Sequence, residues 1–439
     1  MTFTPTAFTL ERSLRHDRRT SSLLEPVEPR GPARGSTERT AMLALTAALI
    51  FQPILHPSGP GNSSPVDLFT LTAILTGAIW AFSGHHKLRA PYFIPMALFV
   101  AAGAASGLFG PLPTTSLLTL LTDLLLFAWC TTAVNVLTAP RAMRVALAAW
   151  CWSGIFWAGL VIAAWLGHIT PLEGLSAADG NRVLFTFGDP NYAATYWDTT
   201  IFVVYAARTP AKRWMRIAGY IMLLGALALT ESNGGVLALG VGVFFLLLVR
   251  SHRKSGWVGV AATTLVTGLA VGGFFTAVPL NSIRQWAATS NQPLLVNSIG
   301  RSAQSSSERG QLITESKQLY EASYGVVGLG PASTKPLLTQ WLYPYANEAH
   351  DDWLAALAER GVVGLLGLVL LVASAAIRAG PIIARPLSAG YAAAVPLPAG
   401  LVAGLLALSV NSFYEEIFHF RFLWALLAVV AVLGKDARR

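Results

Sequence analysis

One hydrophilic stretch of the chain, between positions 280 and 357, contains an arginine whose setting suggests phosphate chemistry. Arg309 follows the segment 305–308, Ser-Ser-Ser-Glu, whose first and last residues have the spacing of a helix capping box. The pattern predicts a helix with Arg309 in its first turn, beside backbone amides that lack partners. An arginine there can bind a phosphate or a diphosphate. The simpler interpretation is a surface arginine paired with Glu308 or Glu315.

A histidine near the end of the same stretch could act as a general base. Asn347 is a suitable N-cap, so we expect a second helix to start near it, with His350 in the first turn. A helix N-terminus favours neutral imidazole, which is the form that accepts a proton. Glu348, Asp351 and Asp352 act in the opposite direction, which leaves the sign of the pKa shift open. A lone histidine in a loop can also have no function.

The composition excludes a soluble protein. Of the 439 residues, 54% are hydrophobic and only 12% are charged, against about 25% in soluble domains. The net charge of +9 does not indicate a nucleic-acid partner, because Lys and Arg occur in short clusters between apolar runs. Cys130 and Cys151 both fall inside such runs and are expected to be small buried hydrophobes. They indicate neither a disulfide nor a metal site.

The apolar runs are long enough to cross a lipid bilayer, at about 17–25 residues each. They predict an all-α fold of about twelve transmembrane helices. The outer loops 57–65, 110–114, 231–233 and 412–415 contain no Lys or Arg, whereas every inner loop contains some. This bias places both termini in the cytoplasm. The expected spans are 40–56, 66–82, 91–109, 115–137, 143–167, 190–207, 214–230, 234–250, 256–279, 358–377, 387–411 and 416–434.

The topology divides the chain into five parts. A disordered basic arm is expected first. The first apolar run begins only near Thr40, which is too late for an ordinary signal peptide. Nine membrane helices follow, then a long, partly helical external loop, three more membrane helices and a short cytoplasmic tail. Pro396 and Pro398 predict a kink in the eleventh span. The boundaries of the five parts are 1–39, 40–279, 280–357, 358–434 and 435–439.

The ionisable residues inside predicted spans include Asp123, Asp198 and Arg421. A charge there is costly and is usually paired or functional. Asp123 and Asp198 could pair with arginines or serve transport. Arg421 is expected to pair with Glu415 or Glu416, in a structural role.

Three segments, in this order, resemble the O-antigen ligase / O-antigen polymerase family of bacterial envelope glycosyltransferases. The first, 182–191, reads Arg-Val-Leu-Phe-Thr-Phe-Gly-Asp-Pro-Asn and is similar to the family's entry into a membrane helix. The second, 229–235, reads Leu-Thr-Glu-Ser-Asn-Gly-Gly, where the family has a Ser-Arg-Gly-like turn. The third comprises Glu308-Arg309, the Gly-Leu-Gly of 328–330 and the signature of 350–364, His-Asp-Asp-Trp-Leu to Glu-Arg-Gly-Val-Val-Gly.

The resemblance implies an enzyme of the bacterial cytoplasmic (inner) membrane. It would transfer a glycan from a polyprenyl-diphosphate-linked donor to a hydroxyl of a glycan or lipid-anchored acceptor, on the outer face and with inversion. No cofactor and no metal are implied, and the lipid bilayer is the remaining partner. Ligase and polymerase share fold, donor and site, so the sequence does not separate them.

The resemblance also implies roles for individual residues. Arg309 would hold the diphosphate, and His350 would orient or deprotonate the acceptor hydroxyl. Arg182 would be a second contact to phosphate or sugar, and Asn191 would brace the loop. The family's turn arginine is Asn233 here, and its His-Asn pair is His350-Asp351. Asn233 and Asp351 are therefore also expected to contact the substrate. Diphosphate binding would therefore depend more on further arginines, of which the candidates are Arg182, Arg301 and Arg284.

Two other classes of function remain open. A secondary transporter would show internal repeats with broken helices in matching positions, and the long external loop would have no role in it. A non-catalytic flippase partner, or another component of polysaccharide export, would tolerate replacement of Arg309 and His350.

Overall fold

The computed structural model describes residues 35–59, 62–84, 86–174, 182–292, 295–322, 327–343 and 348–439. Most of the expected basic arm, residues 1–34, lies outside this part of the chain, as does Asn347. Helices make up the fold, and the described residues form no strand. The all-α prediction is confirmed to that extent.

The helices follow the apolar runs of the sequence. In chain order they are α1 (Ser36–Ile50), α2 (Val66–Ser83), α3 (Phe93–Phe109), α4 (Pro113–Val136), α5 (Pro140–Leu166), α6 (Thr170–Glu173), the 3-10 helix η3 (Phe185–Phe187), α7 (Pro190–Ala207), α8 (Arg213–Leu229), α9 (Asn233–Ala277), α10 (Leu280–Ala288), the π-helix η4 (Val296–Gly300), α12 (Ser302–Ala322), α13 (Thr334–Gln340), α14 (Asp352–Ala384), α15 (Ala389–Ala394), α16 (Ala399–Asn411) and α17 (Arg421–Asp436).

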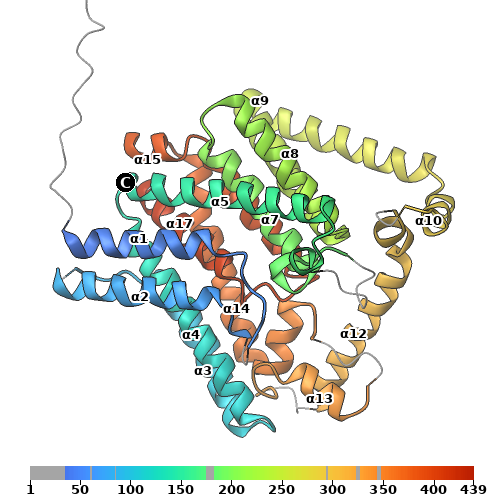
Figure 1. The fold of residues 1–439 in the computed structure, drawn as a ribbon, viewed down its shortest axis with the longest axis horizontal. Helices are drawn as coiled ribbons and strands as arrows, with labels where there is room; N and C mark the ends of the chain where they lie inside the picture. The colour runs from blue at the N-terminus through green and yellow to red at the C-terminus, as the bar shows by residue number, and fades with distance from the viewer. Residues whose placement is uncertain are drawn as a thin grey trace, which may run out of the picture.

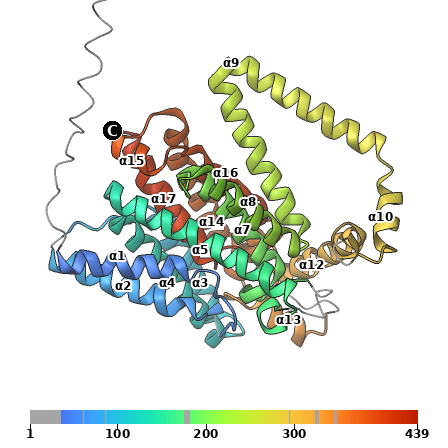
Figure 2. The same cartoon turned by 45° about the horizontal axis from the view of Figure 1, so that its top comes forward.

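Every predicted span overlaps at least one of these helices. The eighth and ninth spans both fall in α9, which folds back at Gly256 (φ 61°) as two arms (Figures 1 and 2). The eleventh span is interrupted between α15 and α16, at Pro396 and Pro398, as their sequence predicts. Within the described residues, five helices are long and apolar enough to cross a membrane: α2, α4, α5, α9 and α14. The count of about twelve spans therefore stays a prediction.

Close packing of small and aromatic residues holds the bundle together. A Cβ added to Gly242 of α9 would lie 2.2 Å from the ring of Phe202 on α7, so only glycine allows this approach. Gly154 of α5 makes a similar contact, because a Cβ there would lie 2.4 Å from the side chain of Thr200. Contacts at small residues are the usual means of helix association in lipid, where apolar burial alone gives no driving force.

Two of the buried charges are paired within the bundle. Asp123 of α4 contacts Arg360 of α14 at 2.8 Å, and the Arg360 guanidinium lies 4.1 Å from the centre of the Phe99 ring. Asp198 of α7 is fully buried, and its carboxylate has no hydrogen-bond partner among the described residues. The pairing expected for Asp123 is therefore present.

The partner expected for Arg421 was wrong. Arg421 Nε donates a 2.8 Å hydrogen bond to Oδ1 of Asp67, at the start of α2. Glu415 and Glu416 are instead engaged by the chain segment that precedes α14, as shown below. Arg421 is the first residue of α17, and its side chain reaches Asp67 of α2. Assembly of the bundle therefore selects a partner far away in sequence over the adjacent acids.

Different segments of the chain lie at the two ends of the bundle. The start of α1 and the C terminus lie at one end, and α12 and α13 lie at the opposite end (Figures 1 and 2). Helices α7, α9 and α14 begin at this second end, where the segments that precede them meet.

Candidate active site

Three helices begin around one polar site, and each has a side chain that caps its N-terminus. Asp189 accepts from the amides of Asn191 and Tyr192 at the start of α7, at 2.6 and 3.3 Å. Ser232 accepts from the amide of Gly235 in α9 at 3.2 Å. The caps fix the direction in which the preceding loops enter. Three helix N-termini also give this site a positive electrostatic bias.

The third cap corrects the predicted start of the second loop helix. Asp351 accepts from the amides of Trp353 and Leu354 at 2.8 and 2.9 Å, so α14 begins at Asp352 and not near Asn347. His350 therefore precedes the helix instead of lying in its first turn, with a left-handed φ of 48°. The Asp351 carboxylate, expected to contact substrate, is occupied by this capping role.

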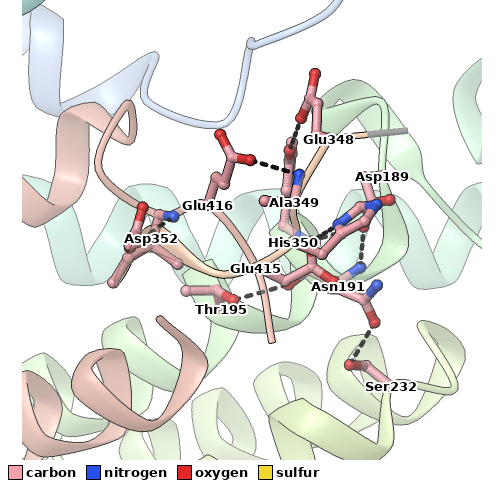
Figure 3. Close-up of polar contacts among 12 residues, drawn as sticks. Asp189, Asn191, Thr195, Ser232, Glu348, Ala349, His350, Asp352, Glu415 and Glu416 are labelled. Carbon is pink, nitrogen blue, oxygen red and sulfur yellow. Dashed lines mark hydrogen bonds and ion pairs between the residues drawn. The ribbon is translucent and has the colours of Figure 1, made fainter. Parts of the chain in front are cut away.

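His350 is paired with an acid from a distant loop. Its Nδ1 lies 2.8 Å from Oε2 of Glu415, which belongs to the segment between α16 and α17 (Figure 3). Burial alone would lower the pKa of His350. The charge and hydrogen bond of Glu415, with the charges of Asp189 and Glu348, instead raise it to about 9. Near pH 7 the imidazole is therefore mostly protonated and forms an ion pair with Glu415.

More acidic groups surround this pair (Figure 3). Burial, together with the charge of Glu415, raises the pKa of Asp189 to about 7. Tyr192 donates from its hydroxyl to Glu348 at 3.3 Å. Glu416 accepts from the amide of Ala349 at 3.0 Å, which fixes the backbone immediately before His350. The histidine is thus oriented by residues from α7, from its own loop and from the segment before α17.

Arg309 reaches the same site from α12. This helix starts at Ser302, so the predicted capping box at 305–308 was wrong: α12 follows directly after η4, and Arg309 lies about two turns beyond its start. The Arg309 guanidinium lies 5.1 Å from the centre of the Tyr414 ring. It forms no ion pair with Glu308 or Glu315 in the described structure. Tyr414 and its neighbour Glu415 therefore bring Arg309 and His350 to one surface.

Arg182 and Asn191 join the loop before α7 to the turn before α9. Arg182 is 3% exposed and donates from Nε to the carbonyl of Thr230 at 2.8 Å. Its Nη2 donates to Oδ1 of Asn191 at 3.0 Å, and Ser232 Oγ donates to the same oxygen at 2.8 Å. Because these contacts hold both segments, Arg182 is fixed in place beside the site.

The turn before α9 contributes a second charged group. Glu231 is 9% exposed, and burial raises its pKa to about 7, although Asn297, Arg182 and Arg301 act to lower it. Asn233, at the position of the family's turn arginine, donates to the carbonyl of Ser298 at 3.0 Å and so ties α9 to η4.

Hydrogen bonds join the loop that follows α12 to α14, next to a kink in that helix. Glu359 accepts from the amides of Ala332 and Thr334 and from the Thr334 hydroxyl, at 2.8, 3.3 and 2.8 Å. Gly328 has φ 81°, and a Cβ there would lie 2.6 Å from the backbone of Glu359. The kink at Gly361 (φ 66°) completes this junction. The Gly-Leu-Gly and Glu-Arg-Gly motifs of the sequence therefore meet in space.

Sequence reasoning missed several residues of this site. Glu415 was considered only as a partner for Arg421, and Asp189 and Glu231 were seen only as parts of motifs. Tyr192 and Tyr414 gave no signal. Arg284 lies on α10 and is exposed. Among the described residues, no group of three His, Cys, Asp or Glu side chains could hold a metal ion.

Fold and site together define a helical membrane protein with a polar site formed by loops at one end of the bundle. Residues 218–369 match the sequence model of the O-antigen ligase family. The match supports assignment of the chain to this family, and the resemblance seen in the sequence is confirmed. It covers Glu231, Arg309, His350 and Glu359, and leaves out Arg182 and Glu415. No curated protein matches the chain.

Proposed function

We propose that this protein transfers a glycan from a polyprenyl diphosphate carrier to an acceptor hydroxyl on the outer face of the cytoplasmic membrane. The observation that carries the proposal is the meeting of Arg309 and His350 at Tyr414 and Glu415. A cation suited to phosphate and an imidazole held by a carboxylate are the two groups that such a transfer requires. The family match supports a glycosyltransferase of the O-antigen ligase type.

His350 would act on the acceptor. Glu415 holds its Nδ1 and so orients the imidazole, which would act on the acceptor hydroxyl. The acceptor oxygen attacks the anomeric carbon, its proton passes to neutral His350, and the bond between that carbon and the diphosphate oxygen breaks. Glu415 stabilises the imidazolium that results. A raised pKa makes His350 a strong base, but one that must first lose its resting proton.

Arg309 would act on the donor, where negative charge grows on the leaving diphosphate. Its guanidinium is held against Tyr414 without a carboxylate partner in the described structure, so its charge is available. Arg182 and Arg301 are close enough to Glu231, in the turn before α9, to lower its pKa, and they would add to this positive charge. Preorganised cations of this kind stabilise developing charge without reorganising during the reaction. They would supply the electrostatic catalysis of a metal-independent enzyme.

An apolar groove beside the site supports a lipid-linked donor. It has a volume of about 330 Å³ and starts at Asp352, Trp353 and Ser412, directly after His350 and before Tyr414. From there it follows α14 past Leu371 and Ala375 as far as Ile383, between α14, α16 and α17. A groove of this lining suits a hydrocarbon chain whose diphosphate lies at the polar end.

The topology completes the proposal. Both termini would be cytoplasmic, about twelve helices would cross the membrane, and the loop 280–357 would be external. The basic residues of the inner loops support this orientation. Single cysteines placed at Thr289 and Arg439, both exposed, in a variant without Cys130 and Cys151, test it: a membrane-impermeant thiol reagent should label only the first in intact cells.

The activity is tested with purified protein and a lipid-linked oligosaccharide, with and without a candidate acceptor. A ladder of products indicates a polymerase, and a single transferred block indicates a ligase. His350→Ala should abolish both products while the protein remains in the membrane. Wild-type turnover by His350→Ala would overturn the proposed mechanism and would favour a non-catalytic role in export.

A further inference from the structure

An acidic residue lies near two of the arginines assigned above to the diphosphate. Glu231 occupies the turn between α8 and α9 and has a left-handed φ of 53°, an unfavourable conformation for a residue with a side chain. Its amide donates to the carbonyl of Ala228 at 3.0 Å. The carbonyl of the preceding Thr230 is held by Arg182. Backbone contacts therefore fix where this carboxylate points, and strain of this kind is common at functional sites.

The charged groups that face Glu231 come from two other segments. Arg182 belongs to the loop before α7, and Arg301 follows η4, which also provides the hydrogen bond from Asn297. Neither Oε2 of Glu231 nor Nε of Arg301 has a hydrogen-bond partner among the described residues, although both atoms are buried. The Glu231 carboxylate thus lies near two arginines, while one of its oxygens and one arginine nitrogen lack a hydrogen bond within the described structure.

We propose that Glu231 is an internal counter-ion for Arg182 and Arg301, which the donor's diphosphate displaces, so that binding of the donor brings a proton onto Glu231. The inference rests on the function proposed above, because it assigns these arginines to the diphosphate. It adds an acid whose protonation regulates diphosphate binding, a role that the family's turn arginine cannot fill.

The displacement follows from electrostatics. In the empty site the Glu231 carboxylate balances part of the positive charge that would otherwise be buried without a counter-ion. When diphosphate takes over the arginines, an ionised Glu231 would lie beside a second anion in a poorly solvated turn. A proton from solvent removes this repulsion. After transfer, the polyprenyl diphosphate product still occupies the arginines, and ionisation of Glu231 would favour its release.

The pKa of about 7 gives the expected pH dependence. If only the protonated form of Glu231 accepts diphosphate, the affinity falls as pH rises, by up to about tenfold between pH 6 and pH 8. Glu231→Gln, which mimics the protonated form, should bind equally well at both values. Glu231→Asp keeps a titrating acid and should restore the dependence.

Titration calorimetry tests this with farnesyl diphosphate as the probe and the full-length protein in detergent. Measurement at pH 7.5 in two buffers of different ionisation enthalpy gives the number of protons taken up on binding. Wild type and Glu321→Gln, which removes an exposed acid from α12, should take up more protons than Glu231→Gln. Equal proton uptake and equal pH dependence in wild type and Glu231→Gln would overturn the inference. Absence of any binding by wild type would instead overturn the proposed function.

Discussion

Glu415 holds the imidazole of His350 at 2.8 Å, and the two residues are 65 positions apart in the chain. The contact joins the segment before α14, inside the matched family region, to the segment before α17, outside it. The Arg309 guanidinium lies over the ring of Tyr414, the residue before Glu415 in the chain. One short segment, between α16 and α17, therefore organises both proposed catalytic groups.

Replacement of Glu415 should move the pH dependence of turnover. His350 must be neutral to accept a proton, and its pKa of about 9 means that kcat of the wild type should rise with pH up to about 9. Glu415→Gln removes the charge that raises this pKa, so the rise should move to lower pH. The plateau should also fall, by roughly tenfold to a hundredfold, because the imidazolium loses its counter-ion. The measurement is kcat at saturating donor against pH, with Glu321→Gln as the control; an unmoved profile would exclude a His350–Glu415 unit.

Removal of the Arg309 charge should act on the transition state. Arg309→Ala is expected to lower kcat/KM by about a hundredfold to a thousandfold, the range seen when one preorganised donor is lost. Arg309→Lys should recover part of the loss, because lysine keeps the charge but lacks the planar fork. Arg284→Ala, at an exposed position on α10, is the matched control. Equal activity of Arg309→Ala and Arg284→Ala would contradict the assignment.

Obstruction of the apolar groove should affect long-chain donors selectively. Ala376 lines the groove and is exposed, so Ala376→Phe can narrow it without disturbing the core. We expect KM for a long polyprenyl donor to rise by about three- to tenfold, with little change for a short-chain analogue. Ala373→Phe, on an exposed part of the same helix that does not line the groove, should change neither. The idea fails if both donors respond alike.

The buried pair of Asp123 and Arg360 should matter for stability. The two side chains are 8% and 6% exposed, so loss of one partner leaves a charge without compensation inside the bundle. Arg360→Ala is expected to cost about 3–5 kcal/mol. Asp123→Asn combined with Arg360→Gln should lose less than Arg360→Ala, because neither charge then remains. Thermal unfolding of the purified proteins in detergent provides the comparison, and a double variant no more stable than Arg360→Ala would argue against this account.

Local patterns in the sequence determined much of the fold. Apolar runs form helices at every predicted position, because main-chain hydrogen bonding in lipid has to be satisfied within each segment. Pro396 and Pro398 interrupt a helix where their missing amides require it. The motifs, taken in order, resemble the O-antigen ligase family, and the match over residues 218–369 supports that resemblance. The start of α14 was misjudged by a few residues, since Asp351 and Asn347 are both good caps and only packing selects between them.

Tertiary structure decided which side chains meet. Arg421 pairs with Asp67 and not with the nearby Glu415 or Glu416, because helix packing sets the distance between charges and sequence separation does not. The same packing leaves Glu415 for His350 and brings Arg309 to Tyr414. Sequence therefore specifies which segments form helices and which residues can do chemistry. Contacts between segments far apart in the chain arise only when the helices assemble, and they decide which of those residues form the site.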